Sequence, residues 1–298
     1  MNRLLLGSAL LTLGACAPSP PAEDDVQPLI VASIHPVADL LARIGGDAVR
    51  VEALLPPRAA PDTWELTPSR VRLLASAEGY VTVGAGLDGW VDGLGEVGPR
   101  PTARLRLTDH VTLSESDHAH GHGVEEGDPH VWLDPILVRD DLLPVLTEFV
   151  VSRAPEAADA IRARGGAVAD SLTALDAWIR RELTPVSGRG FVATHGAWGY
   201  FSRRYGVESL GSVYERPGHE PSATGLAALV RSARAAGLAA ILTEPQLADG
   251  TARALAREVG AAVEIVDPLG GPGLDGRETY YDMMRFNARA FARAMADR

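Results

Sequence analysis

Hydrophobic and polar residues alternate along this chain in a strand–helix rhythm that begins near residue 28. Short apolar runs predict β-strands at residues 28–35, 49–57, 80–86 and 103–109. Between the first three runs, residues 36–46 and 68–79 have helical periodicity, and each segment opens on a proline, which suits the first turn of a helix. Short strands that alternate with helices predict a parallel sheet covered by helices.

One helical pattern, at residues 155–183, is longer than the rest and follows a helix expected from Asp134-Pro135 to about Ser152. Its apolar residues recur at helical spacing, at Ile161, Val168, Leu172, Leu175 and Ile179. The alternation then starts again, with strands expected at residues 189–196, 207–214, 239–245 and 261–270. The long helix could simply cover one sheet, but its position between two complete alternations favours a connector.

The predicted fold is therefore α/β, with two Rossmann-like lobes whose sheets are mostly parallel. We expect the N-terminal lobe at residues 29–153, a rigid linking helix at 154–185 and the C-terminal lobe at 186–298. A stiff connector predicts that the lobes move little relative to each other. Ligands of open α/β sheets bind beyond the carboxyl ends of the strands, so the cleft between the lobes is the expected binding site.

The N-terminal segment has the pattern of an export signal. A short basic start precedes an apolar stretch from Leu4 to Leu13, which is too short to span a bilayer. Residues 1–16 end in Leu-Gly-Ala-Cys, which resembles the bacterial lipobox and implies lipidation of Cys16, the only cysteine. A plain signal peptide with a chance cysteine is the alternative. Residues 17–28 predict a flexible tether, so we expect an exported protein, periplasmic or at the cell surface, anchored through Cys16.

Composition and charge narrow the possible function classes. The chain of 298 residues has a formal net charge of −11, which argues against nucleic-acid binding because that needs basic patches. A negatively charged protein instead attracts cations. The hydrophobic content of 46% is ordinary for a globular protein, and no segment after the N-terminal stretch has the pattern of a transmembrane helix.

Histidines and aspartates stand where the predicted strands end. Three of them, His35, His195 and Asp267, close apolar runs. Asp62 lies just after the second strand, and His130 precedes a helix in the motif Asp128-Pro129-His130. Imidazole and carboxylate form the ligand set of a borderline divalent ion such as zinc, so we expect these residues to line the cleft from both lobes. Structural alternatives exist, such as a helix cap for His35 and turns for Asp62 and Asp267.

A histidine- and acid-rich segment at residues 115–128 separates the predicted fourth strand from the next helix. His118, His120 and His122 alternate, so an extended chain places them on one side, where they could bind a metal weakly. One interpretation is a loop that scavenges or delivers metal above the cleft, and the alternative is a solvated insert that binds metal incidentally. We expect deletion of residues 117–127 to leave one tight site intact.

These motifs are similar to those of a known family, the substrate-binding lipoproteins of bacterial zinc and manganese ABC importers. The most specific parts of the resemblance are residues 128–135, 192–206, 219–223, 241–246 and 266–270. The resemblance covers nearly the whole chain after the signal, and it implies two lobes joined by a long rigid helix with the metal in the cleft. It places His130, His195 and Asp267 on ligand positions. The implied partners are an ABC permease and its ATPase, and we expect a monomer.

One position departs from the family pattern. The family usually has a histidine shortly after the second strand, in a motif like Pro-His-x-Tyr, and here Asp62 stands in its place. If Asp62 ligates, two histidines and two carboxylates favour harder ions such as manganese. If His35 replaces the missing imidazole, three histidines suit zinc. We expect the second set, because the histidine-rich loop also indicates zinc, and it comprises His35, His130, His195 and Asp267.

The expected function is therefore a solute-binding protein that captures Zn²⁺, or alternatively Mn²⁺, and delivers it to a permease. Four protein ligands would close the coordination shell and leave no open position for catalysis. A zinc hydrolase is a second hypothesis, but neither an HExxH motif nor a GxSxG elbow occurs in the chain. A metal-dependent adhesin or chaperone without a transporter is a third. Glu220 and Glu244, each followed by a proline, are interpreted as structural or permease-facing residues.

Overall fold

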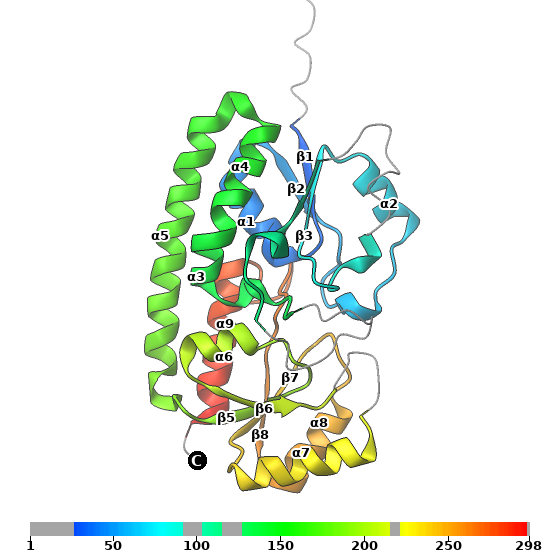
Figure 1. Ribbon diagram of the computed structural model, residues 1–298, viewed down its shortest axis with the longest axis vertical. Helices are drawn as coiled ribbons and strands as arrows, with labels where there is room; N and C mark the ends of the chain where they lie inside the picture. Colours follow the sequence, from blue (N-terminus) through cyan, green and yellow to red (C-terminus); the bar gives the residue numbers. More distant parts are fainter. Residues whose placement is uncertain (1–26, 92–102, 115–126, 215–220, 297–298) are drawn as a thin grey trace, which may run out of the picture.

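The computed structural model describes residues 27–91, 103–114, 127–214 and 221–296. Within these ranges the chain forms two four-stranded parallel sheets, one in each half, with helices packed around them (Figure 1). The long helix α5 (Ala158–Leu183) runs alongside both halves. The predicted α/β class with two parallel sheets and one long helix is confirmed.

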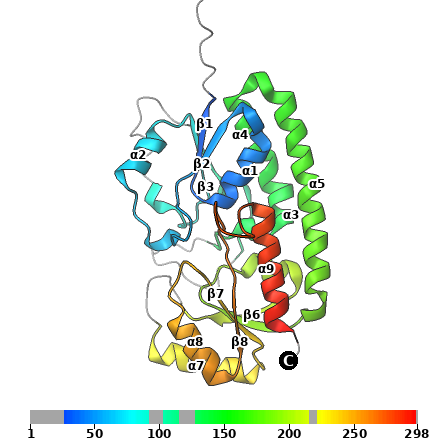
Figure 2. The ribbon, with the colours of Figure 1, turned by 180° about the vertical axis from the view of Figure 1, so that it is seen from behind.

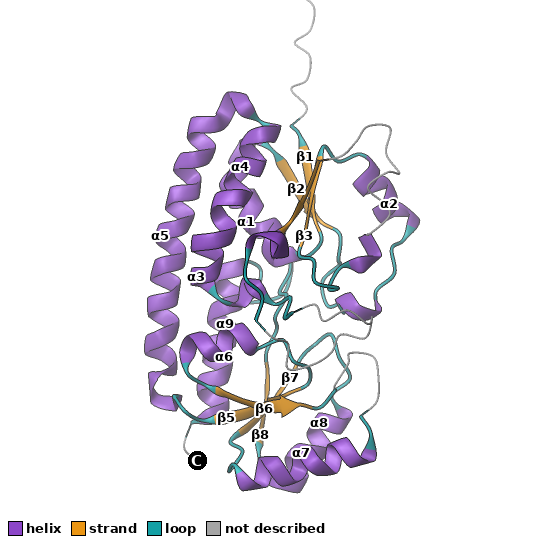
Figure 3. Cartoon of the chain, in the orientation of Figure 1, coloured by secondary structure: helices purple, strands orange, loops and turns teal. Residues whose placement is uncertain are grey.

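The N-terminal sheet has the strand order β2-β1-β3-β4, and every neighbouring pair is parallel. Its strands are β1 (Leu29–Ala32), β2 (Arg50–Ala53), β3 (Gly79–Thr82) and β4 (Ala103–Arg106). The central strands β1 and β3 are buried along their whole length, as expected for a parallel sheet that is covered on both faces. Helix α2 lies on one side of this sheet, and helices α1 and α4 lie on the other (Figure 3). Their bounds are α1 (His35–Gly45), α2 (Pro68–Ala75) and α4 (Leu143–Arg153).

The C-terminal sheet repeats this arrangement, with the order β6-β5-β7-β8 and only parallel pairs. Its strands are β5 (Gly190–Ala193), β6 (Glu208–Ser212), β7 (Ala240–Thr243) and β8 (Ala262–Ile265). Helices α7 and α8 cover its outer face, and α6 and α9 lie on the face toward the other lobe (Figure 1). Their bounds are α6 (Gly199–Tyr205), α7 (Ala223–Ala235), α8 (Gly250–Val259) and α9 (Tyr280–Met295). In both sheets the strand order reverses beside the first strand, and such a switch point opens a crevice at the carboxyl ends.

The helix expected from residue 135 to about 152 is interrupted. A short helix α3 (Pro135–Leu137) is followed by a π-helical turn at Val138–Leu142 and then by α4. Pro144 explains the break, because proline has no N–H to donate and its ring disturbs the preceding turn. The expected cap is present, since Asp134 accepts hydrogen bonds from Ile136 N at 2.9 Å and Leu137 N at 3.2 Å.

Helix α5 is part of the core rather than a free spacer. The five apolar residues that mark its helical pattern in the sequence are all buried. One hydrophobic cluster extends from the N-terminal lobe through α5 and α9 into the C-terminal lobe. Figure 2 shows α9 lying beside α5. Each sheet also has one smaller hydrophobic cluster on its other face.

Direct hydrogen bonds also join the two lobes. Asp39 Oδ2 on α1 accepts a bond of 3.0 Å from the backbone N–H of Tyr280, the first residue of α9. The Trp132 indole donates to the Pro268 carbonyl at 2.7 Å, and the Tyr280 hydroxyl donates to the Trp132 carbonyl at 2.8 Å. Helix α9 therefore starts against the N-terminal lobe although it belongs to the C-terminal half of the chain. None of the helices in the described ranges is long and apolar enough to cross a membrane.

Candidate metal centre

A cavity lies where the two lobes face each other, and residues from both lobes form its wall. Asp62 and His130 line it from the N-terminal lobe. His195, Glu244 and Gln246 line it from the C-terminal lobe. The side chains in this wall thus include two imidazoles, two carboxylates and one amide, which are the groups that bind divalent metals.

His195 lies at the carboxyl end of β5, beside the switch point of the C-terminal sheet. Glu244 directly follows the neighbouring strand β7, and this adjacency of β5 and β7 brings the two side chains together. His195 Nδ1 lies 2.8 Å from Glu244 Oε2, which is within ion-pair distance. Burial opposes the charged form of His195, but the carboxylate of Glu244, with Asp62 and Asp128, outweighs it and raises the pKa of the imidazole.

His130 has an equivalent carboxylate partner two residues earlier in the chain. Its Nδ1 lies 2.8 Å from Asp128 Oδ1, and the same oxygen accepts a bond of 3.0 Å from the His130 backbone N–H. Both side chains are buried. The Asp-Pro-His motif therefore fixes the ring before any ion arrives.

The imidazole rings of His130 and His195 lie next to each other in the cavity wall. Their ring centroids are 5.4 Å apart, and the planes are inclined by 62°. Because each Nδ1 contacts a carboxylate, Nε2 is the nitrogen through which each ring would bind an ion. In the described part of the chain, no three side chains of His, Cys, Asp or Glu are gathered closely enough to hold a metal as they stand.

Asp62 is the carboxylate at the rim of this cavity. It lies in a 3-10 turn, Pro61–Thr63, after β2, and its side chain is exposed. Its charge contributes to the raised pKa of His195, which places it within electrostatic reach of that ring.

His35 lies outside this wall. It is the first residue of α1, and its Nε2 lies 2.8 Å from the backbone carbonyl oxygen of Glu278. This contact ties the N-terminal lobe to the loop before α9. The structure thus places His35 at a seam between the lobes.

Asp267 is fully buried just behind the cavity, whose lining includes its neighbours Pro268 and Leu269. Its Oδ1 accepts hydrogen bonds from Gln246 Nε2 at 2.7 Å, Leu269 N at 3.1 Å and Gly270 N at 3.0 Å. Its Oδ2 accepts a bond of 3.1 Å from Arg277 Nη1. Both carboxylate oxygens are therefore engaged by protein donors.

Other expected residues lie outside the described ranges. These are the lipobox cysteine, Cys16, and the histidines of the acid-rich loop, His118, His120 and His122. Glu220 also lies outside them. Where these side chains lie relative to the cavity stays a prediction.

Two residues of the wall have roles that the sequence interpretation did not assign. Glu244 was expected to be structural or permease-facing, and it holds His195 while also accepting a 3.3 Å bond from Trp198 Nε1. Gln246 received no role. The position of Glu244 in the sequence could have revealed its place in the wall, because Glu244 follows a buried apolar strand just as His195 does.

Comparisons with known proteins agree with this arrangement. Residues 30–294 match the family model described as zinc-uptake complex component A, periplasmic. The chain is 26% identical over 305 residues to the zinc-binding lipoprotein AdcA of Streptococcus pneumoniae serotype 4, which covers 97% of this chain but only 60% of AdcA. It is 28% identical over 302 residues to the manganese-binding lipoprotein MntA of Halalkalibacterium halodurans, covering 97% and 95% of the two chains. A crystal structure of ZnuA superposes with a TM-score of 0.80 at 29% identity, covering 91% of this chain and 100% of that one.

The family match extends over nearly all of the described chain and includes both lobes and α5. It confirms the resemblance expected from the motifs. This family is described by zinc uptake, which gives no support to the zinc hydrolase hypothesis. With a cavity between two parallel-sheet lobes and two carboxylate-held imidazoles in its wall, this chain belongs to the family of periplasmic component A proteins of zinc-uptake complexes.

Proposed function

We propose that this protein captures a divalent transition metal outside the cytoplasm, with Zn²⁺ as the first candidate, and delivers it to an ABC permease and its ATPase. The observation that supports this most is the pair of buried imidazoles in the interlobe cavity, each held at Nδ1 by a carboxylate. A carboxylate behind a histidine fixes the ring and makes the other nitrogen a better metal ligand. Membership of the zinc-uptake family supports the same function.

The proposed protein ligands include Nε2 of His130, Nε2 of His195 and the carboxylate of Asp62. The two histidines have their Nδ1 atoms engaged, and Asp62 lines the same cavity. His35 contacts a backbone carbonyl elsewhere, and Asp267 is engaged by Arg277 and Gln246, so we propose structural roles for both. This set differs from the one that the motifs favoured.

Manganese is the second candidate cargo, because of Asp62. A carboxylate in place of the third imidazole makes the ligand set harder, and harder sets suit Mn²⁺ better. One relative, MntA of Halalkalibacterium halodurans, is named a manganese-binding lipoprotein.

Metal analysis of the purified protein tests these proposals. We expect one tightly bound Zn²⁺ per chain, measured by metal content and by competition with a chromogenic chelator. His195→Ala should abolish it, Asp62→Ala should weaken it, and His35→Ala should leave it intact. Loss of zinc in His35→Ala together with full retention in Asp62→Ala would instead establish the three-histidine set. Equal affinity for Mn²⁺ would make manganese the cargo.

The anchor and the assembly state belong to the same proposal. We infer that lipidated Cys16 tethers a monomer to a membrane beside its permease, and AdcA and MntA are likewise named lipoproteins. Cys16→Ser should release the protein from the membrane fraction of the producing cell, and light scattering should give the mass of one chain. Membrane retention of the variant would contradict the anchor.

The histidine-rich loop is proposed to act as a weak auxiliary binder. Deletion of residues 117–127 should leave the tight site at full affinity and remove only additional, weakly bound metal. Isothermal titration of Zn²⁺ into both proteins separates the two classes of site. Loss of the tight site on deletion would place part of that site in the loop.

A further inference from the structure

We propose that Gln246 binds the captured metal directly through its side-chain oxygen, and that Asp267 holds Gln246 in place instead of binding the metal itself. This inference rests on the proposed function of the cavity. It adds an amide oxygen to His130, His195 and Asp62 as the fourth protein ligand.

The side chain of Gln246 is oriented by a buried carboxylate. Gln246 lies three residues after the end of β7 and lines the cavity that His130 and His195 share. Its Nε2 donates a bond of 2.7 Å to Asp267 Oδ1. A carboxylate only accepts hydrogen bonds, so this contact decides which end of the amide is nitrogen. The other end, Oε1, must therefore point away from Asp267.

The amide oxygen is buried without a partner. Among the described residues, no group donates a hydrogen bond to Gln246 Oε1, although the atom is shielded from solvent. Buried polar atoms are nearly always paired, so an unpaired oxygen in the wall of a metal cavity indicates a ligand that the protein itself does not provide. A metal ion satisfies such an oxygen because amide carbonyls are ordinary ligands of divalent cations.

Both carboxylate oxygens of Asp267 already accept hydrogen bonds from protein donors. Three donors occupy its Oδ1, and the guanidinium of Arg277 occupies its Oδ2. Arg277 is itself held in place by the ring of Phe286, which lies 4.8 Å from the guanidinium carbon. For Asp267 to ligate, this cation would have to leave, whereas Gln246 needs only an ion in the cavity.

The choice of Gln246 rather than Asp267 as the fourth ligand changes the charge of the metal site. An amide oxygen is neutral, so Gln246 contributes no charge and the proposed site has one carboxylate, Asp62, against a divalent ion. Direct ligation by Asp267 would give the site two carboxylates. Gln246 thereby sets the charge of the site, and its oxygen, unlike an imidazole nitrogen, is a ligand type that also suits Mn²⁺.

A variant that removes the oxygen but keeps the shape tests the ligand. We expect Gln246→Met to weaken Zn²⁺ binding by about 10- to 100-fold in chelator competition. The visible spectrum of bound Co²⁺ should also change, because it reports coordination number and geometry. The matched control is Gln27→Met, at the only other glutamine, whose amide contacts a backbone carbonyl of the N-terminal lobe. An unchanged affinity and spectrum in Gln246→Met would overturn the proposal.

A double-mutant cycle separates support from ligation. If Asp267 acts through Gln246, Asp267→Asn weakens Zn²⁺ binding in the wild-type background and has no further effect in Gln246→Met. A further loss in the double variant would show that Asp267 reaches the metal itself. Thermal melting of the metal-free variants verifies that each is folded.

The two glutamines also allow a test that needs no substitution. Selective ¹⁵N labelling of glutamine side chains gives two amide signals, one from Gln246 and one from Gln27. Zn²⁺ should shift the Gln246 signal alone, and an unmoved signal in a protein that binds zinc would overturn the proposal. A wild-type protein that binds no divalent metal would instead contradict the proposed function.

Discussion

An imidazole can present only one nitrogen to an ion when the protein holds the other. In this protein Asp128 and Glu244 hold the Nδ1 atoms of His130 and His195, and both carboxylates are buried. The two rings are therefore oriented without an ion, and in the proposed site this reduces the binding free energy that is lost in ordering them.

Glu244→Gln should weaken Zn²⁺ binding by about 10- to 100-fold, because the amide cannot increase the basicity of the His195 ring as the carboxylate does. Chelator competition at constant pH measures the effect. Glu156→Gln, at an exposed glutamate far from the cavity, is the matched control and should bind like the wild type. An affinity equal to that control would contradict the role of Glu244.

The local sequence pattern predicted some residues of the cavity wall and missed others. His130 and His195 could be placed in the cleft because the carboxyl ends of parallel strands meet there, and the structure places both in the wall. Glu244 occupies the same kind of position, but chain order does not reveal that β7 is the neighbour of β5. The contact of His35 with Glu278 joins positions 243 apart, so no local pattern indicates it. Which residues complete the site stays a prediction.

At the scale of elements, α5 approaches α4 so closely that a side chain is excluded at the contact. A Cβ on Gly165 would lie 2.8 Å from Thr147 Oγ1, whereas a Cβ on the next residue, Gly166, would meet nothing within 4 Å. Thr147 Oγ1 is committed to a bond of 2.7 Å with the Leu143 carbonyl, so it cannot yield without losing that partner.

These adjacent glycines predict opposite effects of the same substitution. Gly166→Ala should raise the free energy of unfolding by about 1 kcal/mol, because alanine loses less backbone entropy in a helix. Gly165→Ala should lower it by about 1–3 kcal/mol through overpacking against Thr147. Urea denaturation of the two variants, each the control for the other, measures both. Equal effects would mean that the helices separate easily.

The elements themselves were largely predictable, and their exceptions have local causes. The buried face of α5 follows from the spacing of its apolar residues, and the Asp134 cap follows from its sequence. The π-helical turn before Pro144 could not be read from apolar spacing, because that spacing continues across it. It reflects a missing backbone donor, which the pattern of hydrophobic residues does not record.

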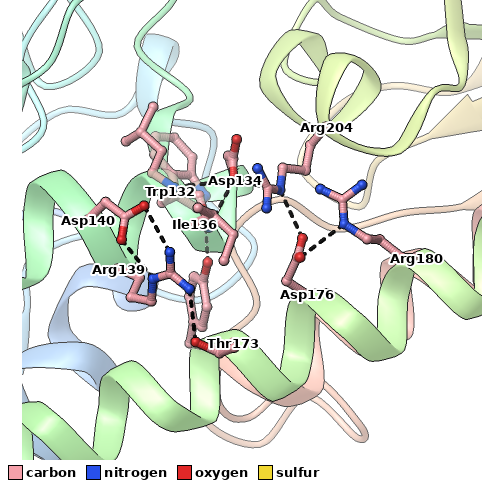
Figure 4. Close-up of polar contacts among 11 residues, drawn as sticks. Trp132, Asp134, Ile136, Arg139, Asp140, Thr173, Asp176, Arg180 and Arg204 are labelled. Atoms are coloured by element: carbon pink, nitrogen blue, oxygen red, sulfur yellow. Dashed lines mark hydrogen bonds and ion pairs between the residues drawn. The ribbon is translucent and has the colours of Figure 1, made fainter.

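At the scale of the molecule, one arginine joins both lobes to the long helix. Arg204 on α6 donates to Asp176 on α5 at 2.8 Å and lies 3.4 Å from Asp134 of the N-terminal lobe (Figure 4). Arg180 donates to the other oxygen of Asp176 at 3.0 Å. Burial opposes the ionised form of Asp176, but the bonds from Arg204 and Arg180 outweigh it and lower the pKa of the carboxyl. Burial has the larger effect on Asp134 and raises its pKa.

The lowered pKa of Asp176 predicts a pH-dependent contribution to stability. The contribution is complete above the ordinary pKa of 3.8 and is lost as the pH falls through the lower value of the folded state. Asp176→Asn should therefore cost about 2 kcal/mol at neutral pH, and its difference from the wild type should shrink toward about pH 3. Urea unfolding at both pH values measures this. Asp170→Asn, an exposed aspartate on the same helix, should change little, and a pH-independent cost of Asp176→Asn would contradict the assignment.

The continuous core predicts that the lobes unfold together. One hydrophobic cluster includes Trp132 of the N-terminal lobe and Trp198 of the C-terminal lobe, both almost fully buried. We expect tryptophan fluorescence and far-ultraviolet circular dichroism to give coincident thermal transitions. Two separated transitions would show that α5 and α9 do not couple the lobes.

The hydrogen bond between Asp39 and the first residue of α9 has a consequence for how the chain is made. Tyr280 N donates to Asp39, so a residue synthesised early receives its partner only when the last described helix has been synthesised. While the chain emerges N-terminus first, the N-terminal lobe lacks α9 and has an incomplete apolar face. We expect it to remain loosely folded until synthesis is nearly complete. A chain in that state can pass through an export channel as an extended strand, so late closure of the fold favours secretion before folding.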